Sequence, residues 1–268
     1  MFQAAAFSTE YGDSEGGKLH RWSSPIVIWA GGEMTREDEE GLDLFIGQLN
    51  TRVGGLPPVY RTGFREEANV TVVYAPLERL NEHSKFYVEG NWGFFSFWWN
   101  ALQEISRAEI AIASDVTSQE ERNHLLMEEL TGSLGLTNDI DSDPDSIIHQ
   151  GWTTTQELSD LDWRLLNQLY DDRLAPGMTF EKASLALGWG NPSSNNGLRV
   201  GSSGQEVLNM KQRFYELGYF RTNQFNNRFT DNTEETVRLF EKNNGLPVDG
   251  VADAQMLSVL FSDDAVKK

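Results

Sequence analysis

Cysteine is absent from the 268-residue sequence, and histidine occurs only four times. Without cysteine the chain can form no disulfide, no thiolate metal site and no cysteine nucleophile. Basic residues are also scarce: 22 Lys and Arg stand against 41 Asp and Glu, for a net charge of −19. This deficit argues against binding to a nucleic-acid backbone, which calls for an excess of cationic side chains. No apolar run approaches the roughly 20 residues of a membrane-spanning helix, so we expect no membrane span.

The negative charge is unevenly distributed along the chain. In residues 198–268 nine basic side chains nearly balance ten acidic ones, so almost all of the net charge lies before them. Residues 188–197 are rich in Gly, Asn, Ser and Pro without apolar periodicity, which is typical of a linker. The start of the chain lacks the basic and apolar regions of a signal peptide. We therefore expect an N-terminal segment, an acidic domain, a linker and a second domain, at residues 1–18, 19–187, 188–197 and 198–263.

The second domain is expected to contain three helices, because apolar residues recur every three or four positions. Leu198 to Val207, Leu217-Gly-Tyr219 and the segment from Gly245 to Gly250 carry its motifs. With Phe229, Thr233, Val237 and Phe240, they resemble the three-helix peptidoglycan-binding repeat of bacterial wall hydrolases. Lys211 and Glu241 replace the usual Gln, and Asp253 a common Gly. The resemblance implies binding to peptidoglycan, with Tyr219, Phe220 and Asp249 as candidate contact residues. The alternative is an ordinary helical domain whose motif residues are core and caps.

The acidic domain alternates strand and helix patterns. β-Branched runs at residues 25–29, 68–74 and 105–114 predict strands. Helices are expected from Thr35, and at capping boxes that pair Ser118 with Glu121 and Ser159 with Asp162. This order predicts an α+β domain with a mixed sheet over long helices, followed by the small all-α domain.

One segment of this domain resembles the zinc helix of zincin metallopeptidases. Residues 128–138 align with the motif H-E-x-x-H-x-x-G-x-x-H, but the three metal positions are Glu128, Gly132 and Asn138. Glu129 stands at the place of the general base, and Ile148 replaces the methionine of the downstream turn. Because glycine offers no ligand atom, zinc is not expected at the usual positions. The resemblance therefore implies a zincin-like fold with a degenerate metal site.

A closer resemblance spans about 160 residues. The motif E-E-L-x-x-x-L-G-L-x-N-D at residues 128–139, the run L-Y-D-x-R-L-x-P-G-M at 169–178 and residues 18–22 resemble a bacterial family known only as a domain of unknown function. This resemblance implies no activity.

The paired glutamates Glu128 and Glu129 are the first candidate catalytic residues. One of them could activate water, or both could anchor loops through hydrogen bonds to the backbone. Adjacent residues on a helix project about 100° apart, so we expect only one of the two to face a cleft. His124, Glu128 and His149 are an alternative zinc set, with a surface histidine on the helix as the simpler interpretation of His124.

Three further features are candidate binding sites. Asp139, Asp141 and Asp143 alternate in an acidic loop that could bind calcium or be merely solvated. Six aromatic residues lie between positions 90 and 100, and could line a cleft or form a core hairpin. The candidate substrate-binding residues are Trp92, Trp98, Trp99, Asn138 and Asp139.

The sequence thus supports two functional hypotheses. The first is a peptidoglycan-binding protein, extracellular or associated with the cell wall, whose zincin-like domain binds a protein, peptide or wall fragment without catalysis. The second is a divergent hydrolase that uses Glu129 as general base with an atypical metal site.

Overall fold

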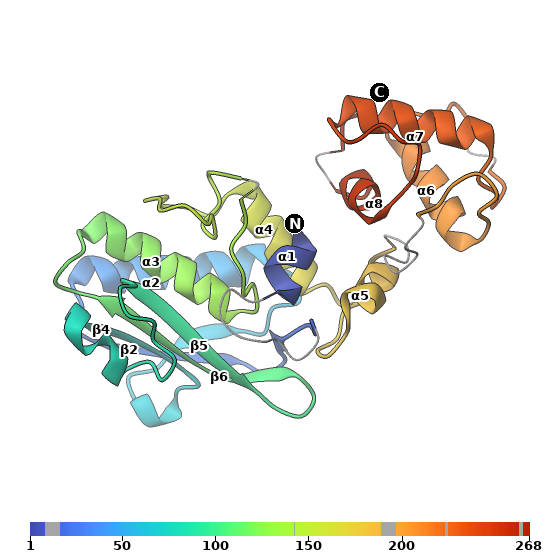
Figure 1. The fold of residues 1–268 in the computed structure, drawn as a ribbon. Helices are drawn as coiled ribbons and strands as arrows, with labels where there is room; N and C mark the ends of the chain where they lie inside the picture. Colours follow the sequence, from blue (N-terminus) through green and yellow to red (C-terminus); the bar gives the residue numbers. More distant parts are fainter. Residues whose placement is uncertain (9–16, 142, 189–196, 223–224, 263–264) are drawn as a thin grey trace. The chain divides into compact units, whose positions relative to one another are not determined.

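The structure is a computed structural model that describes residues 1–8, 17–141, 143–188, 197–222, 225–262 and 265–268. The chain divides into two compact units, Met1–Thr179 and Phe180–Lys268 (Figure 1). The expected linker lies mostly outside the described residues. The expected N-terminal segment belongs to the first unit, because Phe2 and Phe7 of its helix are buried.

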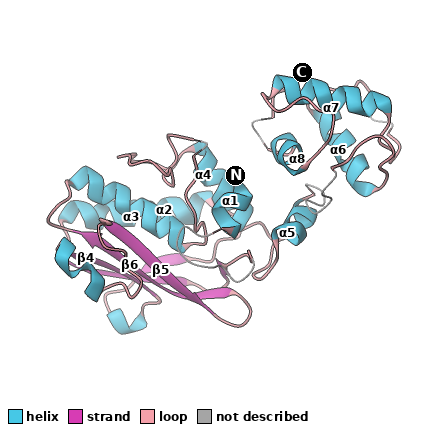
Figure 2. Ribbon diagram, viewed as in Figure 1, coloured by secondary structure: helices cyan, strands magenta, loops and turns pink. Residues whose placement is uncertain are grey.

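A six-stranded mixed sheet forms the centre of the first unit (Figure 2). Strands β3, β2, β4 and β6 lie in that order and run parallel, and β1 is parallel to β6 at its start. Strand β5 pairs antiparallel with β6, with Phe95 opposite Ile110. The predicted mixed sheet is therefore confirmed. The strands are β1 (Arg21–Trp22), β2 (Ile26–Gly32), β3 (Val59–Arg61), β4 (Val70–Ala75), β5 (Gly93–Trp99) and β6 (Glu104–Ala113).

Helices α2 and α3 lie together on one face of this sheet (Figure 1). Both begin at capping boxes, which pair Thr35 with Asp38 and Ser118 with Glu121. A buried ion pair joins the two helices, because Arg122 contacts the carboxylate of Asp38. The helical segments of this unit are α1 (Phe2–Phe7), α2 (Arg36–Arg52), η1 (Arg65–Glu67), η2 (Leu77–Glu82), α3 (Gln119–Ser133) and α4 (Asp160–Leu169).

The C-terminal end of α3 is held by buried aromatic residues. The Tyr170 hydroxyl donates to Leu134 O at 2.8 Å, and Trp22 Nε1 donates to Ser133 O at 3.0 Å. These bonds satisfy carbonyl groups that a helix end leaves without partners. Gly135 then turns the chain with a φ of +117°, where a Cβ would lie 2.3 Å from His20 O. The glycine therefore ends the helix and lets the following loop turn back, as the sequence predicted.

The second unit begins with α5 (Phe180–Leu187), and its described residues contain three further helices. These are α6 (Gln205–Glu216), α7 (Asp231–Asn243) and α8 (Ala254–Leu260). They pack around a core that includes Phe214, Phe229 and Phe240, so the predicted small helical domain is confirmed. Lys211 Nζ donates to loop carbonyls of residues 226 and 228, and Glu241 accepts from Gly250 N, so both replacements of the usual glutamine fix loops.

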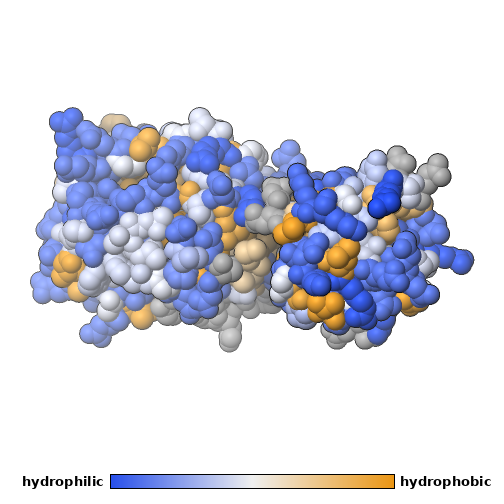
Figure 3. All heavy atoms as spheres, turned by 90° about the horizontal axis from the view of Figure 1, so that it is seen from above, coloured by the Kyte–Doolittle hydropathy of each residue, from blue (hydrophilic) through white to orange (hydrophobic). Residues whose placement is uncertain are grey.

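The surface agrees with the composition. The face of the first unit drawn in Figure 3 is largely hydrophilic, as its negative charge leads one to expect. Among the described residues, none of the helices combines the length and apolar character needed to cross a membrane.

Candidate functional site

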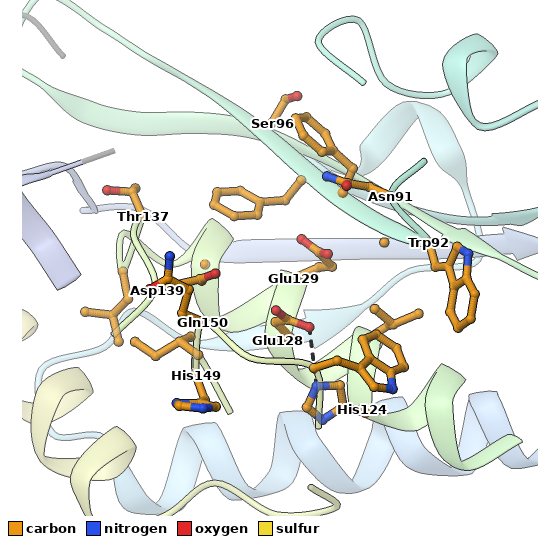
Figure 4. Close-up of a pocket in the computed structure, with 18 of the residues that line it drawn as sticks. Asn91, Trp92, Ser96, His124, Glu128, Glu129, Thr137, Asp139, His149 and Gln150 are labelled. Atoms are coloured by element: carbon orange, nitrogen blue, oxygen red, sulfur yellow. Dashed lines mark ion pairs between the residues drawn. The ribbon is translucent and has the colours of Figure 1, made fainter. Parts of the chain in front are cut away.

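A cavity of about 890 Å³ lies between α3, β5 and the loop that follows α3. Its size is within the range of small-ligand sites. Figure 4 shows Glu128 and Glu129 projecting from α3 between two groups of residues, with Asp139 and His149 on one side and Trp92 on the other. The aromatic lining consists of Phe86, Trp92, Phe94, Phe95, Phe97, Trp99 and Trp152.

Both glutamates of the E-E motif line this cavity, so the expectation that only one would face a cleft is wrong. The cavity is wide enough for both side chains to reach it, although they project in different directions from the helix. Glu129 is 8% exposed, and a Cβ at Gly93 would lie 2.5 Å from its Oε1. The missing side chain of Gly93 therefore lets the Glu129 carboxylate reach the first residue of β5.

His124 is a third polar residue of α3 that lines the cavity, beside Glu128 and Glu129. Its Nε2 lies 3.4 Å from Glu128 Oε2, and its Nδ1 lies 2.9 Å from Thr155 O. Burial opposes protonation, but the bonds to Glu128 and Thr155 outweigh it and raise the pKa of His124 above its usual 6.5. The side chain is 3% exposed, so the interpretation of His124 as a surface residue is wrong. It joins the helix to the loop that carries Trp152.

The opposite wall is a loop segment fixed by α4. The Asp162 carboxylate caps α4 and accepts bonds from Ser146 Oγ at 2.5 Å and from Ile147 N at 2.9 Å. The turn thus held contains His149, which forms a parallel bridge with Ile140. Asp139 and His149 both line the cavity as a result.

Gly132 aligns with the second metal position of the zincin motif, and the space beside it is filled by an aromatic ring from β5. A Cβ on Gly132 would lie 2.4 Å from Cε1 of Phe95. Strand β5 and α3 are thus packed so closely here that the strand's phenylalanine fills the space of a helix side chain. A histidine at this position is sterically excluded unless the Phe95 ring moves.

The aromatic segment meets both interpretations made for it. Residues 93–99 form β5, the first strand of the β5–β6 hairpin, and Trp92 and Trp99 line the cavity. Trp98 is not part of the lining: its ring lies 4.8 Å from the guanidinium carbon of Arg107. The pairing of β5 with β6 shifts register between Trp98 and Trp99, so the two residues differ in their surroundings. Asn138 is also outside the lining, and its amide donates to Asp139 O.

The candidate metal sets are not assembled. Within the described ranges, no group of three or more His, Asp or Glu side chains is close enough to hold a metal ion. This applies to His124, Glu128 and His149, although the first two are paired. It applies equally to Asp139, Asp141 and Asp143.

Residues 1–188 match the family described as protein of unknown function (DUF2927). The chain belongs to the DUF2927 family. Residues 203–260 match the peptidoglycan-binding domain family, which supports a role in binding the cell wall. No curated protein matches the chain. The DUF2927 match includes α1 and α5, so this family's region is longer at its N-terminal end than the expected range of 19–187.

The candidate contact residues of the peptidoglycan-binding domain differ in exposure. Tyr219 is 6% exposed, and its hydroxyl donates to Val266 O and accepts from Asn243 Nδ2. Its ring is therefore part of the core. Phe220 is half-buried beside Phe214, and Asp249 is exposed, which leaves these two as the accessible members of the set.

Sequence reasoning missed several residues of the DUF2927 cavity. Trp152, 56% exposed, contacts the rings of Trp92 and His124 from a loop without a regular pattern. A lone tryptophan after Gly151 in a polar loop was a usable signal. Gly93 and His20 gave none, because their importance depends on which elements pack together.

Proposed function

We propose that the protein binds peptidoglycan through residues 198–263 and uses the cavity of its DUF2927 domain to hold a peptide or wall fragment without cleaving it. The domain is then a degenerate zincin-like module in an extracellular or wall-associated protein. The resemblance of residues 128–138 to a zinc helix supports this origin.

One observation carries the non-catalytic part of the proposal. The Phe95 ring occupies the space that a ligand at position 132 would need. A zinc site needs an open helix face with two ligands one turn apart, but here the Phe95 ring packs directly against that face at Gly132. The rest of the cavity, with aromatic walls beside carboxyl and imidazole groups, has the character of a binding site.

A second candidate function rests on Glu129. Its carboxylate is nearly buried yet lines the cavity, a setting in which a general base can activate water. In that case the domain is a divergent hydrolase of peptide or wall substrates with an atypical metal site. The two candidates differ in a single outcome, the cleavage of a bound peptide.

Wall binding is tested by sedimentation with insoluble peptidoglycan. We expect the full chain to co-sediment and a chain without residues 198–268 to stay in solution. Retention of the truncated chain would assign wall binding to the DUF2927 domain instead.

Ligand binding in the cavity is tested by calorimetry with a soluble digest of peptidoglycan. Trp152→Leu should weaken binding, since it removes an exposed ring from the cavity wall. Phe64→Leu, which replaces a similarly exposed aromatic residue outside the cavity lining, is the matched control. Equal heats for the wild type and Trp152→Leu would contradict binding in this cavity.

A further inference from the structure

The charge of the cavity lining is one-sided. Glu128, Glu129 and Asp139 contribute three carboxyl groups, and no Lys or Arg is found among the described residues that line it. His20, His124 and His149 are the only basic residues of the described lining, and a protonated His124 offsets only the charge of its partner Glu128. A cavity that is partly closed by apolar walls focuses such a negative potential. The cavity therefore disfavours anionic ligands such as phosphates and favours cations.

One corner of the cavity combines aromatic faces with a carboxylate. The rings of Trp92 and Trp152 meet edge to face with centroids 5.3 Å apart, and the His124 ring lies 5.8 Å from Trp152. His124 is bonded in turn to Glu128, which brings a carboxylate to this corner. Indole rings beside a carboxylate are a recurrent way of holding an ammonium group.

The remaining walls suit an extended chain more than a bare amine. The cavity volume of about 890 Å³ far exceeds the space of one ammonium group. Phe95, Phe97 and Trp99 continue along β5 as a row of rings, with centroids 6.2 and 5.8 Å apart. Apolar surface of this length can cover the backbone and small side chains of a short peptide.

We propose that the DUF2927 cavity selects peptides that carry a free side-chain amine, with the ammonium group held by Glu128, Trp92 and Trp152. The inference rests on the proposed function, because it names the chemical class of the ligand for the same cavity. Stem peptides of peptidoglycan with a free diamino-acid side chain belong to this class, and they are present wherever the second domain binds.

The test compares two peptides that differ only in this amine. The probes are the pentapeptide L-Ala-γ-D-Glu-L-Lys-D-Ala-D-Ala, blocked at its N terminus and amidated at both carboxyl groups so that the amine is its only charge, and the same peptide acetylated on the lysine side chain. Calorimetry on the full chain should give binding that acetylation weakens by about tenfold or more. Equal affinity for the two peptides would overturn the inference and leave the proposed function standing. Failure of both peptides to bind would overturn the proposed function together with the inference.

A pair of variants tests the role of Glu128. Glu128→Gln should remove most of the preference for the free amine, because it removes a charge from the aromatic corner. Glu120→Gln is the matched control: it makes the same change on an exposed residue of α3 outside the cavity lining, and it should keep the preference. An undiminished preference in Glu128→Gln would overturn the assignment of the ammonium group to this corner.

Discussion

At the scale of single residues, the contact between Gly132 and the Phe95 ring is the central feature of the site. The sequence reveals only that Gly132 aligns with the second ligand position of the zincin motif that residues 128–138 resemble. The structure adds that the vacant space is filled, because the Phe95 ring lies where a side chain of residue 132 would begin. The absence of a side chain at Gly132 and the close packing of β5 on α3 are thus parts of one arrangement.

Substitution of Gly132 should therefore be costly. Gly132→Ala places a Cβ 2.4 Å from Phe95 Cε1, and overpacking of this kind lowers the free energy of unfolding by about 1–3 kcal/mol. Gly47→Ala in α2 is the control, since a Cβ there meets nothing within 4 Å. Alanine should stabilise that helix position by about 0.5–1 kcal/mol. Urea unfolding measures both, and a Gly132→Ala protein as stable as the wild type would contradict the packing described.

His124 should titrate above its usual range in the folded protein. Burial lowers its pKa, but the Glu128 and Thr155 bonds raise it by more. A raised folded pKa contributes stability below the unfolded value of 6.5 and loses it as the pH rises through the folded value. Imidazole titration by NMR should give a pKa above 6.5 in the wild type and a lower one in Glu128→Gln. An unchanged pKa in that variant would show that the ion pair is not its cause.

At the level of elements, the long helices were predictable and the short strands were not. The helix start expected at Thr35 and the capping boxes expected at Ser118 and Ser159 are all found in the structure. Strands β1 and β3 have two and three residues, too few for a periodic pattern. Strand β5 was predicted only as one of two alternatives, because its adjacent aromatic residues hide the period of two that marks a strand.

Asp162 shows how one element positions the site through another. It caps α4 and also accepts bonds from the turn that carries His149. Asp162→Ala should lower the free energy of unfolding by about 2–4 kcal/mol, since it removes the cap and leaves a buried backbone donor without a partner. Asp160→Ala, an exposed position in the same first turn, should cost less than about 1 kcal/mol. Similar losses in thermal or urea unfolding for the two variants would contradict this role of Asp162.

At the scale of the whole molecule, charge and composition predicted two domains separated at residues 188–197. The structure also has two units, but it divides the chain between Thr179 and Phe180, so α5 belongs to the second unit. The cavity was less accessible to sequence reasoning. Its helix residues and two of its tryptophans were identified from the motif and the aromatic cluster. Its width, the closure at Gly132 and the contribution of Trp152 depend on how β5 packs on α3.

The charge distribution predicts how wall binding responds to salt. The peptidoglycan-binding domain has little net charge, so its attachment depends on contacts that salt screens only weakly. Repulsion between the acidic domain and anionic wall polymers should weaken as salt rises. Binding of the full chain to peptidoglycan should therefore stay within about twofold, or increase, between 0.05 and 0.5 M NaCl. A fall of tenfold would indicate attachment through charge.

Cleavage is the measurement that most directly separates a binding domain from an enzyme. The wild-type chain and Glu129→Gln are incubated with the amine-bearing pentapeptide and with peptidoglycan in the presence of zinc, and the products are identified by mass spectrometry. We predict that both substrates remain intact at the same background level with either protein. Products formed by the wild type and absent with Glu129→Gln would contradict the non-catalytic function and establish a hydrolase.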